Sequence, residues 1–350
     1  MIRVLHVLKS SRYAGAENAA ITICNGLGTP YKTAYASVDG PIAWCVRGAG
    51  LEFYPMRQFS IAEVKRVLQE FRPDIVHAHD YSASVFCAVL KNGYRLISHL
   101  HNNPPWIRSW SARSCAYAMT AGKMDRILTV SDEIRKEAVF LRRRKGIFVV
   151  SNPVDTARIR KRAEEFQPGT ANTKNTNNID LLFVGRLTKQ KNPQRFIRVV
   201  SRLARGRRQR VSAVMLGCGE LETECRRMVR RTGLSGYVRL LGFCENPYPY
   251  IRRARILLVT SDWEGYGIAA AEAIALGTPV LAMASGGLKT IFARFPEALC
   301  HSEEEMYRKA KRLLWERAAY TSFQEALCRN VSIVDLPDYQ TGIRRIYDGL

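Results

Sequence analysis

Short runs of consecutive apolar residues alternate with helix-length segments along the whole chain. A strand that is covered on both faces carries apolar side chains on both, so its sequence is continuously apolar rather than alternating. Stretches with helical periodicity, such as NAAITICNGL and IAEVKRVLQEF, lie between the runs. Strands that alternate with helices in this way form parallel sheets, so we expect an α/β fold. The runs are 2–8, 32–38, 74–79, 95–101, 125–131, 146–152, 179–186, 211–217, 237–243, 254–261 and 278–285.

The length of 350 residues is too great for one compact domain and suits two. The tract FQPGTANTKNTNN, residues 166–178, contains a Pro-Gly pair and many Asn and Thr residues, which is typical of a linker. We therefore expect an N-terminal domain over 1–165 and a C-terminal domain over 179–335. The terminal segment 336–350 is too short for a domain and is expected to pack back on one of the two, in the first instance the N-terminal one.

Several protein classes are excluded by composition. No apolar run reaches the roughly 20 residues that a membrane-spanning helix needs. The opening MIRVLHVLKS leads directly into a strand pattern, without the long apolar stretch of a secretory signal. Nine cysteines without a C-x-x-C pair argue against a zinc site or a disulfide framework. These features lead us to expect a protein of the reducing cytoplasm.

The chain is strongly basic, with 54 Lys and Arg against 31 Asp and Glu and a formal net charge of +23. Such a surplus favours an anionic partner, such as nucleic acid, acidic lipid or a phosphorylated substrate. The excess is spread over both halves and no nucleic-acid recognition motif is present, so we do not expect nucleic-acid binding.

Ligands of parallel α/β sheets bind beyond the carboxyl ends of the strands. The segment after the run 254–261 contains Gly265 and Gly267 and then an apolar helix, and a glycine-rich entry to a helix N-terminus suits a phosphate. Glu272 lies in the middle of this helix and Glu264 lies eight residues earlier. A carboxylate in an apolar helix needs a hydrogen-bond partner. Glu272 is therefore either a ligand group or a structural carboxylate.

Two cationic residues follow another strand run. Arg186 comes directly after Gly185, and Lys191 follows five residues later. A planar guanidinium and a lysine together suit a diphosphate, although basic residues are common in this chain. Gly15 follows the first run, where a glycine lets the backbone approach a ligand or a helix pack closely.

Four histidines lie at the ends of two strand runs: His77 and His79, and His99 and His101. Residues two apart on a strand share a face. Four histidines around zinc are one interpretation. Nothing in the sequence indicates that the pairs converge, so we favour a polar cleft lining and expect no bound metal.

The segment 104–119 interleaves Trp106, Trp110 and Tyr117 with arginines. It is either an interfacial helix for anionic lipid, an acceptor-binding loop or a partly buried helix with solvated arginines. The basic runs 142–145, 205–210 and 226–231 are typical of solvated helix faces or loops.

Taken together, these motifs occur in the right order over nearly the whole chain, and the chain resembles the retaining glycosyltransferases of family 4. The resemblance implies the GT-B fold, in which two Rossmann-like, doubly wound domains face each other across a cleft. Its most specific element is the E-x7-E pair in EGYGIAAAEAIALGTPV. The other matching elements are Arg186/Lys191, the G-A-E turn at Gly15, DIVHAH at 74–79, His101 in HLHN, TVSD at 129–132 and SNPVD at 151–155.

The resemblance also implies roles for individual residues in binding a nucleotide-diphosphate sugar, with a UDP-sugar favoured. Arg186 and Lys191 would hold the diphosphate in place of a metal, and Glu264 would hold the donor sugar. Glu272 would bind the ribose hydroxyls, and His101 would line the junction of donor sugar and acceptor. The remaining donor-side positions would be Gly15, Gly265, Gly267, Gly242, Phe243, Gly286 and Gly287.

The implied reaction transfers a hexosyl or N-acetylhexosaminyl group, without a metal or other cofactor, to a glycan or lipid-linked acceptor. The basic surface adds the expectation of a peripheral position on the anionic inner membrane face. One departure from the family pattern is Thr290, which stands where the G-G-x-x-E element has its glutamate. It keeps open a non-catalytic nucleotide-sugar-binding partner subunit, and the architecture also keeps open a nucleotide-sugar epimerase.

Overall fold

The structure is a computed structural model that describes residues 1–165, 179–205 and 211–350. The chain divides into two compact units, the first made of Met1–Pro153 with Leu336–Leu350 and the second of Val154–Asp335. The expected linker, 166–178, lies outside the described residues. The division comes earlier than the expected boundary after residue 165, because helix α7 (Thr156–Glu164) packs on helices of the second unit.

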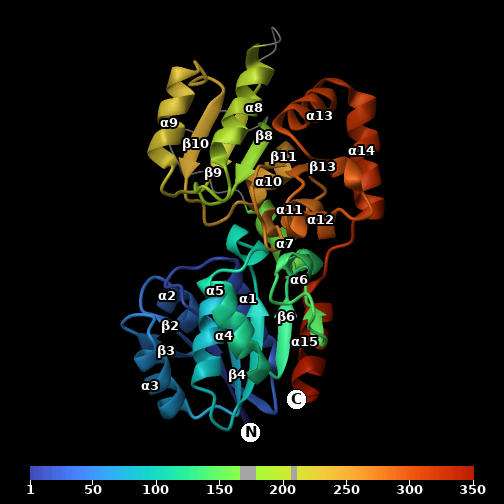
Figure 1. The fold of residues 1–350 in the computed structure, drawn as a ribbon. Coiled ribbons are helices and arrows are strands. Elements are labelled where there is room, and N and C mark those ends of the chain that lie inside the picture. The colour runs from blue at the N-terminus through green and yellow to red at the C-terminus, as the bar shows by residue number, and fades with distance from the viewer. Residues whose placement is uncertain (166–178, 206–210) are drawn as a thin grey trace. The chain divides into compact units, whose positions relative to one another are not determined.

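The first unit is a seven-stranded parallel sheet with strand order β3-β2-β1-β4-β5-β6-β7. Its helices cover the sheet (Figure 1). The chain order reverses between the neighbouring strands β1 and β4. The strands are β1 (Ile2–Val7), β2 (Tyr31–Val38), β3 (Glu52–Met56), β4 (Ile75–His79), β5 (Arg95–Leu100), β6 (Arg126–Thr129) and β7 (Ile147–Val149). The helices are α1 (Gly15–Leu27), α2 (Ile42–Gly48), α3 (Ile61–Phe71), α4 (Asp80–Val89), α5 (Ala112–Thr120), α6 (Asp132–Glu137) and α15 (Leu336–Asp348), with 3₁₀ turns at Pro105–Arg108 and Ala121–Lys123.

Helix α15, at the end of the chain, completes the first unit. It packs beside α1. Its Asp348 accepts a hydrogen bond of 2.5 Å from the Tyr31 hydroxyl, and its Arg344 donates one of 2.8 Å to the Thr29 carbonyl. Tyr339, Ile343 and Tyr347 form its buried face, so the helix is held by apolar packing as well as by polar contacts.

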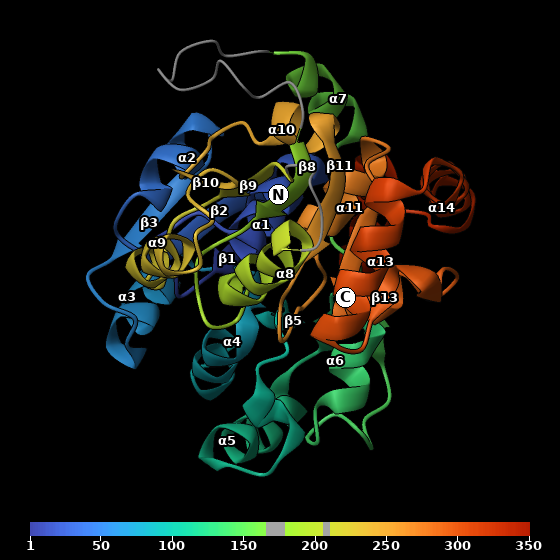
Figure 2. The same ribbon diagram turned by 90° about the horizontal axis from the view of Figure 1, so that it is seen from above.

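The second unit is a six-stranded parallel sheet with strand order β10-β9-β8-β11-β12-β13. Helices α13 and α14 lie beside its β13 edge (Figures 1 and 2). The strands are β8 (Ile179–Val184), β9 (Ala213–Leu216), β10 (Val238–Gly242), β11 (Ala254–Val259), β12 (Val280–Met283) and β13 (Leu299–Cys300). The helices besides α7 are α8 (Pro193–Arg205), α9 (Glu222–Arg231), α10 (Tyr248–Arg253), α11 (Ile268–Ala275), α12 (Gly287–Ile291), α13 (Glu303–Trp315) and α14 (Arg317–Asn330), with a 3₁₀ turn at Pro296–Ala298.

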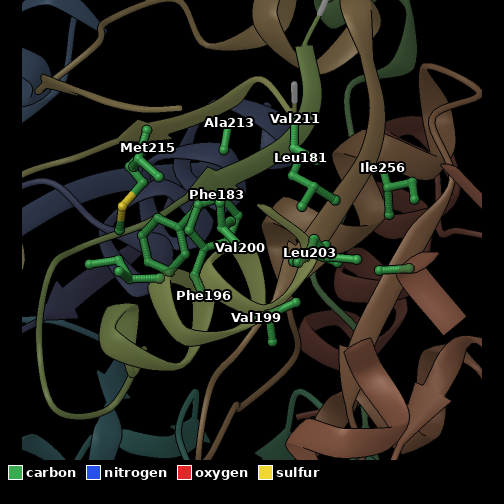
Figure 3. Packing of buried hydrophobic residues seen from close by; sticks show 14 of the residues in the cluster. Leu181, Phe183, Phe196, Val199, Val200, Leu203, Val211, Ala213, Met215 and Ile256 are labelled. Carbon is green, nitrogen blue, oxygen red and sulfur yellow. The ribbon is translucent and has the colours of Figure 1, made fainter. Parts of the chain in front are cut away.

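The core of the second unit lies between α8 and the sheet (Figure 3). Phe196, Val200 and Leu203 recur at helical spacing along α8 and meet Phe183 of β8 and Met215 of β9. Full burial of one such side chain contributes about 1.5–3 kcal/mol. This packing holds β8, and the loop that follows β8 carries part of the candidate site.

Every predicted strand run contains a strand of the structure, and both sheets are parallel, as expected. Two further strands were not predicted, β3 and β13. Both lie at sheet edges. Strand β3 mixes polar and apolar residues and contains Pro55, and β13 has only two residues, so neither has the continuous apolar pattern of a central strand. No helix among the described residues is both long enough and apolar enough to cross a membrane.

Candidate functional site

The centre of the second sheet brings the predicted residues of two loops together. Strands β8 and β11 are neighbours at which the chain order reverses, and the loops after them leave the carboxyl edge of the sheet. A ligand of such a sheet binds at this reversal. The loop after β8 carries Arg186 and Lys191, and the loop after β11 carries Glu264. The two loops are joined by hydrogen bonds from Asp262 N–H to the Gln190 carbonyl, 2.9 Å, and from Gln190 Nε2 to the Trp263 carbonyl, 3.1 Å.

Lys191 and Glu264 form an ion pair, with Lys191 Nζ donating to Glu264 Oε1. The side chain of Glu264 is only 7% exposed and that of Lys191 is 23% exposed, so the pair is largely shielded from water. The Ser261 hydroxyl donates a second hydrogen bond of 2.7 Å to the same carboxylate oxygen. The aliphatic part of Lys191 passes over Gly185, where an added Cβ would lie 3.7 Å from its carbons. The pair therefore links the loops that follow β8 and β11.

Arg186 takes no part in this ion pair. Its side chain is exposed and has no acidic partner among the residues that the structure describes. The two cations that the sequence grouped together are thus in different states, with Lys191 neutralised by Glu264 and Arg186 free for an anion.

Close backbone approach or a positive φ explains three glycines of the site. An added Cβ at Gly287 would lie 2.2 Å from the Gly265 carbonyl oxygen, and Gly287 N–H donates a hydrogen bond of 2.8 Å to the Glu264 carbonyl. Gly267 has a φ of 108° and begins helix α11, a conformation that a side chain disfavours. Gly286, with a φ of 48°, stands at the start of α12. The predicted glycines therefore pack the loop of Glu264 against the start of α12.

Glu272 has the hydrogen-bond partner that its place in an apolar helix demands. The Tyr248 hydroxyl of α10 donates to Glu272 Oε1 at 3.0 Å. Burial raises the pKa of Glu272 to about 7, although the Tyr248 hydrogen bond and the charge of Arg158 act in the opposite direction. Arg162 lies over the Tyr248 ring, 5.6 Å from its centroid. A carboxylate with these neighbours can accept hydrogen bonds from hydroxyl groups.

Sequence reasoning missed Tyr248, Arg158 and Ser261. Arg158 lies on α7, which the expected boundary assigned to the first domain, and Tyr248 lies in the aromatic stretch NPYPYI, which has no recognised pattern. Ser261 is the last residue of a predicted strand run. Its position at the carboxyl end of a strand, where ligands bind, could have identified it.

The predicted donor-side positions Gly242 and Phe243 lie at the end of β10. Gly242 ends the strand with a φ of 77°, and its carbonyl accepts a hydrogen bond of 2.7 Å from Gly217 N–H. Phe243 follows, with 77% of its surface exposed. An exposed aromatic ring at a strand end can stack on a planar ligand.

In the first unit, Gly15 is the first residue of α1 and follows β1. The predicted residue His101 follows β5 and is 8% exposed. Its backbone N–H donates to Asp80 Oδ1 at 2.8 Å. Burial lowers the pKa of His101 to about 3 and raises that of Asp80 to about 7, so the ring is neutral near pH 7.

The two histidine pairs do converge, contrary to the expectation of a cleft lining. His77 and His99 are fully buried, and His6 of β1 joins the group. Parallel register places His6 beside His77 and His79 beside His99, and residues two apart share a face. Two overlapping sets of three histidines have ligand nitrogens within 4.8 Å of one another, His6/His77/His79 and His79/His99/His101.

The tryptophan-rich segment is mostly a packed element. Tyr117 is fully buried and Trp106 packs on Tyr81 with ring centroids 4.7 Å apart, while Arg108 pairs with Glu137 at 3.1 Å. Of the segment's aromatic residues Trp106, Trp110 and Tyr117, only Trp110 is largely exposed. Of the basic runs, 226–231 forms the solvated end of α9 and 142–145 is mostly exposed, whereas most of 205–210 lies outside the described residues.

Known proteins share this architecture over both units. Residues 6–158 match the family described as Glycosyltransferase Family 4, and residues 168–326 match Glycosyl transferases group 1. An uncharacterized glycosyltransferase of Methanocaldococcus jannaschii is 25% identical over 236 residues, which are 63% of this chain and 57% of that protein. The lipopolysaccharide core biosynthesis glycosyltransferase LpsE of Rhizobium meliloti is 26% identical over 227 residues, 64% of this chain and 60% of LpsE.

The chain thus spans between half and two thirds of the length of these two curated relatives. The structure of Anabaena HepE in complex with UDP and glucose superposes with a TM-score of 0.83 at 18% identity and full coverage of both chains. Such a likeness shows the two-domain GT-B fold. With its first unit matching one family description and its second unit the other, the chain belongs to the family 4 glycosyltransferases.

Proposed function

We propose that the protein transfers a hexosyl or N-acetylhexosaminyl group from a nucleotide-diphosphate sugar to a glycan or lipid-linked acceptor, with retention of anomeric configuration. The observation that carries this proposal is the shielded Lys191–Glu264 pair at the β8/β11 reversal, with the exposed Arg186 in the same loop as Lys191. It supplies both cations for a diphosphate and a carboxylate for sugar hydroxyls at one sheet edge. UDP is the favoured nucleotide, supported by the complex of the similar Anabaena HepE with UDP and glucose.

The donor would be held from several sides of the second unit. Arg186 can bind the diphosphate bidentately, and Lys191 can share its ammonium between Glu264 and a phosphate oxygen. Glu272, fixed by Tyr248, would accept hydrogen bonds from the ribose hydroxyls. Phe243, exposed at the end of β10, would stack on the base.

The chemistry then follows from charge. When the bond between the anomeric carbon and the phosphate oxygen breaks, negative charge develops on the diphosphate, and Arg186 and Lys191 stabilise it. The acceptor oxygen attacks from the face that the diphosphate leaves, and its proton passes to the departing phosphate oxygen. Two fixed cations would supply the stabilisation that a divalent metal provides elsewhere, and the sequence has no D-x-D triplet to hold one.

The acceptor and the location are inferred from charge and relatives. A net charge of +23 favours an anionic acceptor or a lipid surface, and the similar LpsE acts in lipopolysaccharide core biosynthesis. We place the protein in assembly of a surface polysaccharide or glycolipid, as a peripheral protein on the cytoplasmic membrane face. We expect the protein to sediment with acidic vesicles in a salt-sensitive way. If it does not bind the vesicles at low salt, the proposed membrane association is wrong.

Calorimetric titration with UDP, GDP and ADP, first in EDTA and then with magnesium, tests the donor site. We expect micromolar binding of UDP that EDTA does not change. No binding of any of the three would contradict the assignment. Once a donor and an acceptor are found, the anomeric configuration of the product, read by NMR, distinguishes retention from inversion.

One observation favours a second candidate, a nucleotide-sugar-binding partner subunit without activity. Thr290 on α12 replaces the glutamate of the family pattern, and α12 packs against the loop that carries Glu264. UDP-sugar binding without hydrolysis or transfer would support this candidate. Gain of hydrolysis in Thr290→Glu would show that the missing carboxylate is the cause.

A further inference from the structure

Five buried histidines of the first unit and one tyrosine of helix α15 are joined by an unbroken series of hydrogen bonds. Each of the five rings is no more than 8% exposed. We call these six residues the histidine cluster. In order along the bonds they are His99, His77, Tyr347, His6, His79 and His101.

Tyr347 stands in the middle of the series. Its hydroxyl lies 2.6 Å from His77 Nδ1 and 3.4 Å from His6 Nε2. On one side, His77 Nε2 lies 3.2 Å from His99 Nδ1. On the other side the bonds run from His6 to His101, with 3.0 Å between His6 Nδ1 and His79 Nε2 and 2.8 Å between His79 Nδ1 and His101 Nε2.

The two ends of the series are free and close together. His99 Nε2 and His101 Nδ1 are buried and have no hydrogen-bond partner among the residues that the structure describes. Their rings are neighbours, with centroids 4.1 Å apart. An unpaired buried nitrogen costs free energy comparable to a lost hydrogen bond, so this pair of ends calls for a small polar group such as a water molecule or a hydroxyl.

The protonation state of the rings restricts the bonds further. Burial lowers the pKa of His6 and of His101 to about 3 and keeps those of the other three well below the ordinary value. All five rings are therefore neutral near pH 7, and a neutral imidazole has one donor nitrogen and one acceptor nitrogen.

Only two arrangements satisfy every bond and also give the Tyr347 hydroxyl proton an acceptor. If the Tyr347 oxygen accepted from both His77 and His6, that proton would be buried without a partner. If His99 donates from Nδ1 to His77, each later group must donate onward, and all five histidines carry their proton on Nδ1. If His101 donates from Nε2 to His79, the direction reverses and all five carry it on Nε2. In either case one free end is a donor and the other an acceptor.

We propose that the histidine cluster is a single relay in which all five histidines share one tautomer, and that Tyr347 is the positioning residue that couples the proton on His101 to the rest. The C-terminal helix thereby determines, through Tyr347, whether His101 Nδ1 donates or accepts. A shift between the two states moves one proton across every link and one across a group bridging the ends, so no charge is created.

A metal ion is the competing occupant, because the two sets of three histidines described above also fit an ion. In the relay, however, the facing ring nitrogens are already paired with one another at 2.8–3.2 Å. Elemental analysis of the protein purified without chelator separates the two. One equivalent of a transition metal would overturn the relay.

The test is a long-range ¹H–¹⁵N correlation spectrum of the whole chain labelled with ¹⁵N-histidine, near pH 7. His301, exposed and outside the cluster, serves as the internal reference. We expect five ring patterns of the same tautomer, either all Nδ1–H or all Nε2–H. A mixture of the two among the cluster histidines would overturn the proposal, and this result needs no variant.

Tyr347→Phe tests the coupling. It cuts the series into His99–His77 and His6–His79–His101, so the tautomers of the two parts become independent and at least one pattern changes. Tyr339→Phe is the matched control, because Tyr339 is a buried tyrosine of the same helix and its hydroxyl has no hydrogen-bond partner in the described part of the chain. A folded Tyr347→Phe protein in which all five rings keep the wild-type tautomer would contradict the role of Tyr347.

Discussion

The two units carry opposite kinds of polar group at equivalent places in their sheets. Around the β1/β4 reversal of the first unit, neutral histidine rings bond to one another. At the β8/β11 reversal of the second unit, a lysine and a glutamate form a shielded ion pair. Neutral rings satisfy each other without a counter-charge, whereas a buried pair is stable only while both charges are present. Under the proposed function, a diphosphate would share Lys191 with Glu264, whereas the neutral rings of the first unit would offer it no charge.

The largest consequence of this contrast is acid sensitivity of the first unit. The pKa of His6 and of His101 is about 3 in the folded chain against an ordinary 6.5, so the unfolded chain binds more protons between these values. Stability is fully present above about pH 6.5 and falls as the pH drops, by about 1.4 kcal/mol per pH unit for each histidine. Burial also keeps the pKa values of His77, His79 and His99 well below the ordinary value, so these three histidines act in the same direction.

Urea unfolding between pH 7 and pH 5, with hydrogen exchange followed by mass spectrometry, measures this loss in each unit. Asp80, whose pKa is raised to about 7, acts in the opposite direction but is one group against five. Exchange that accelerates in the first unit before the second is the expected result. Equal protection of both units from hydrogen exchange at pH 5 would show that the first unit is not more acid-sensitive than the second.

The next effect in size belongs to the ion pair. Lys191→Met leaves the Glu264 carboxylate shielded without its counter-charge, and we expect a loss of about 3–5 kcal/mol in the free energy of unfolding. Transfer should fall at least 100-fold, the usual cost of removing one donor that stabilises developing charge. Denaturant titration and initial rates measure the two losses.

The double variant Lys191→Met/Glu264→Gln separates stability from chemistry. Both charges are then gone, while the glutamine oxygen still accepts the Ser261 hydrogen bond. We expect most of the stability to return and the activity to stay lost. Recovery of activity in the double variant would show that neither charge takes part in the reaction.

A smaller effect of opposite sign is expected from Glu272 in the second unit. Its folded pKa of about 7 lies above the ordinary 4.5, so its contribution to stability is fully present below pH 4.5 and is lost as the pH rises through 7. The loss amounts to at most about 3–4 kcal/mol. Glu272→Gln, which keeps an acceptor for Tyr248, should flatten this part of the pH profile. A variant with the wild-type profile would assign the pH dependence to another group.

The sequence predicts a site well when its residues follow a single strand, and poorly when they come from several strands. The parallel sheets follow from continuous apolar runs, and the position of Glu264 follows from a strand and the glycines after it. The convergence of the histidines depends on the register of β1, β4 and β5, in which His6 stands beside His77. Register is set by packing across the sheet, so single runs do not reveal it. Likewise, the sequence grouped Lys191 with Arg186 as two cations of one loop, whereas Lys191 forms an ion pair with Glu264 of another loop. That ion pair depends on how close the two loops lie, which neither segment reveals alone.

The smallest effect on stability, and the sharpest on binding, is expected from Arg186. The exposed guanidinium has no acidic partner in the described part of the chain, so Arg186→Ala should change the free energy of unfolding by less than about 0.5 kcal/mol. A charge-assisted hydrogen bond to a phosphate contributes about 1.5–3 kcal/mol, which predicts UDP binding weaker by roughly 10- to 100-fold. Lys189→Ala, an exposed cation three residues along the same loop, is the matched control for general electrostatic attraction. Calorimetry with UDP on both variants decides between a specific contact and a basic surface. If the two variants weaken UDP binding equally, Arg186 acts only as one of many surface charges. Lys191 would then be the remaining candidate, of the two predicted cations, for a specific contact with the diphosphate.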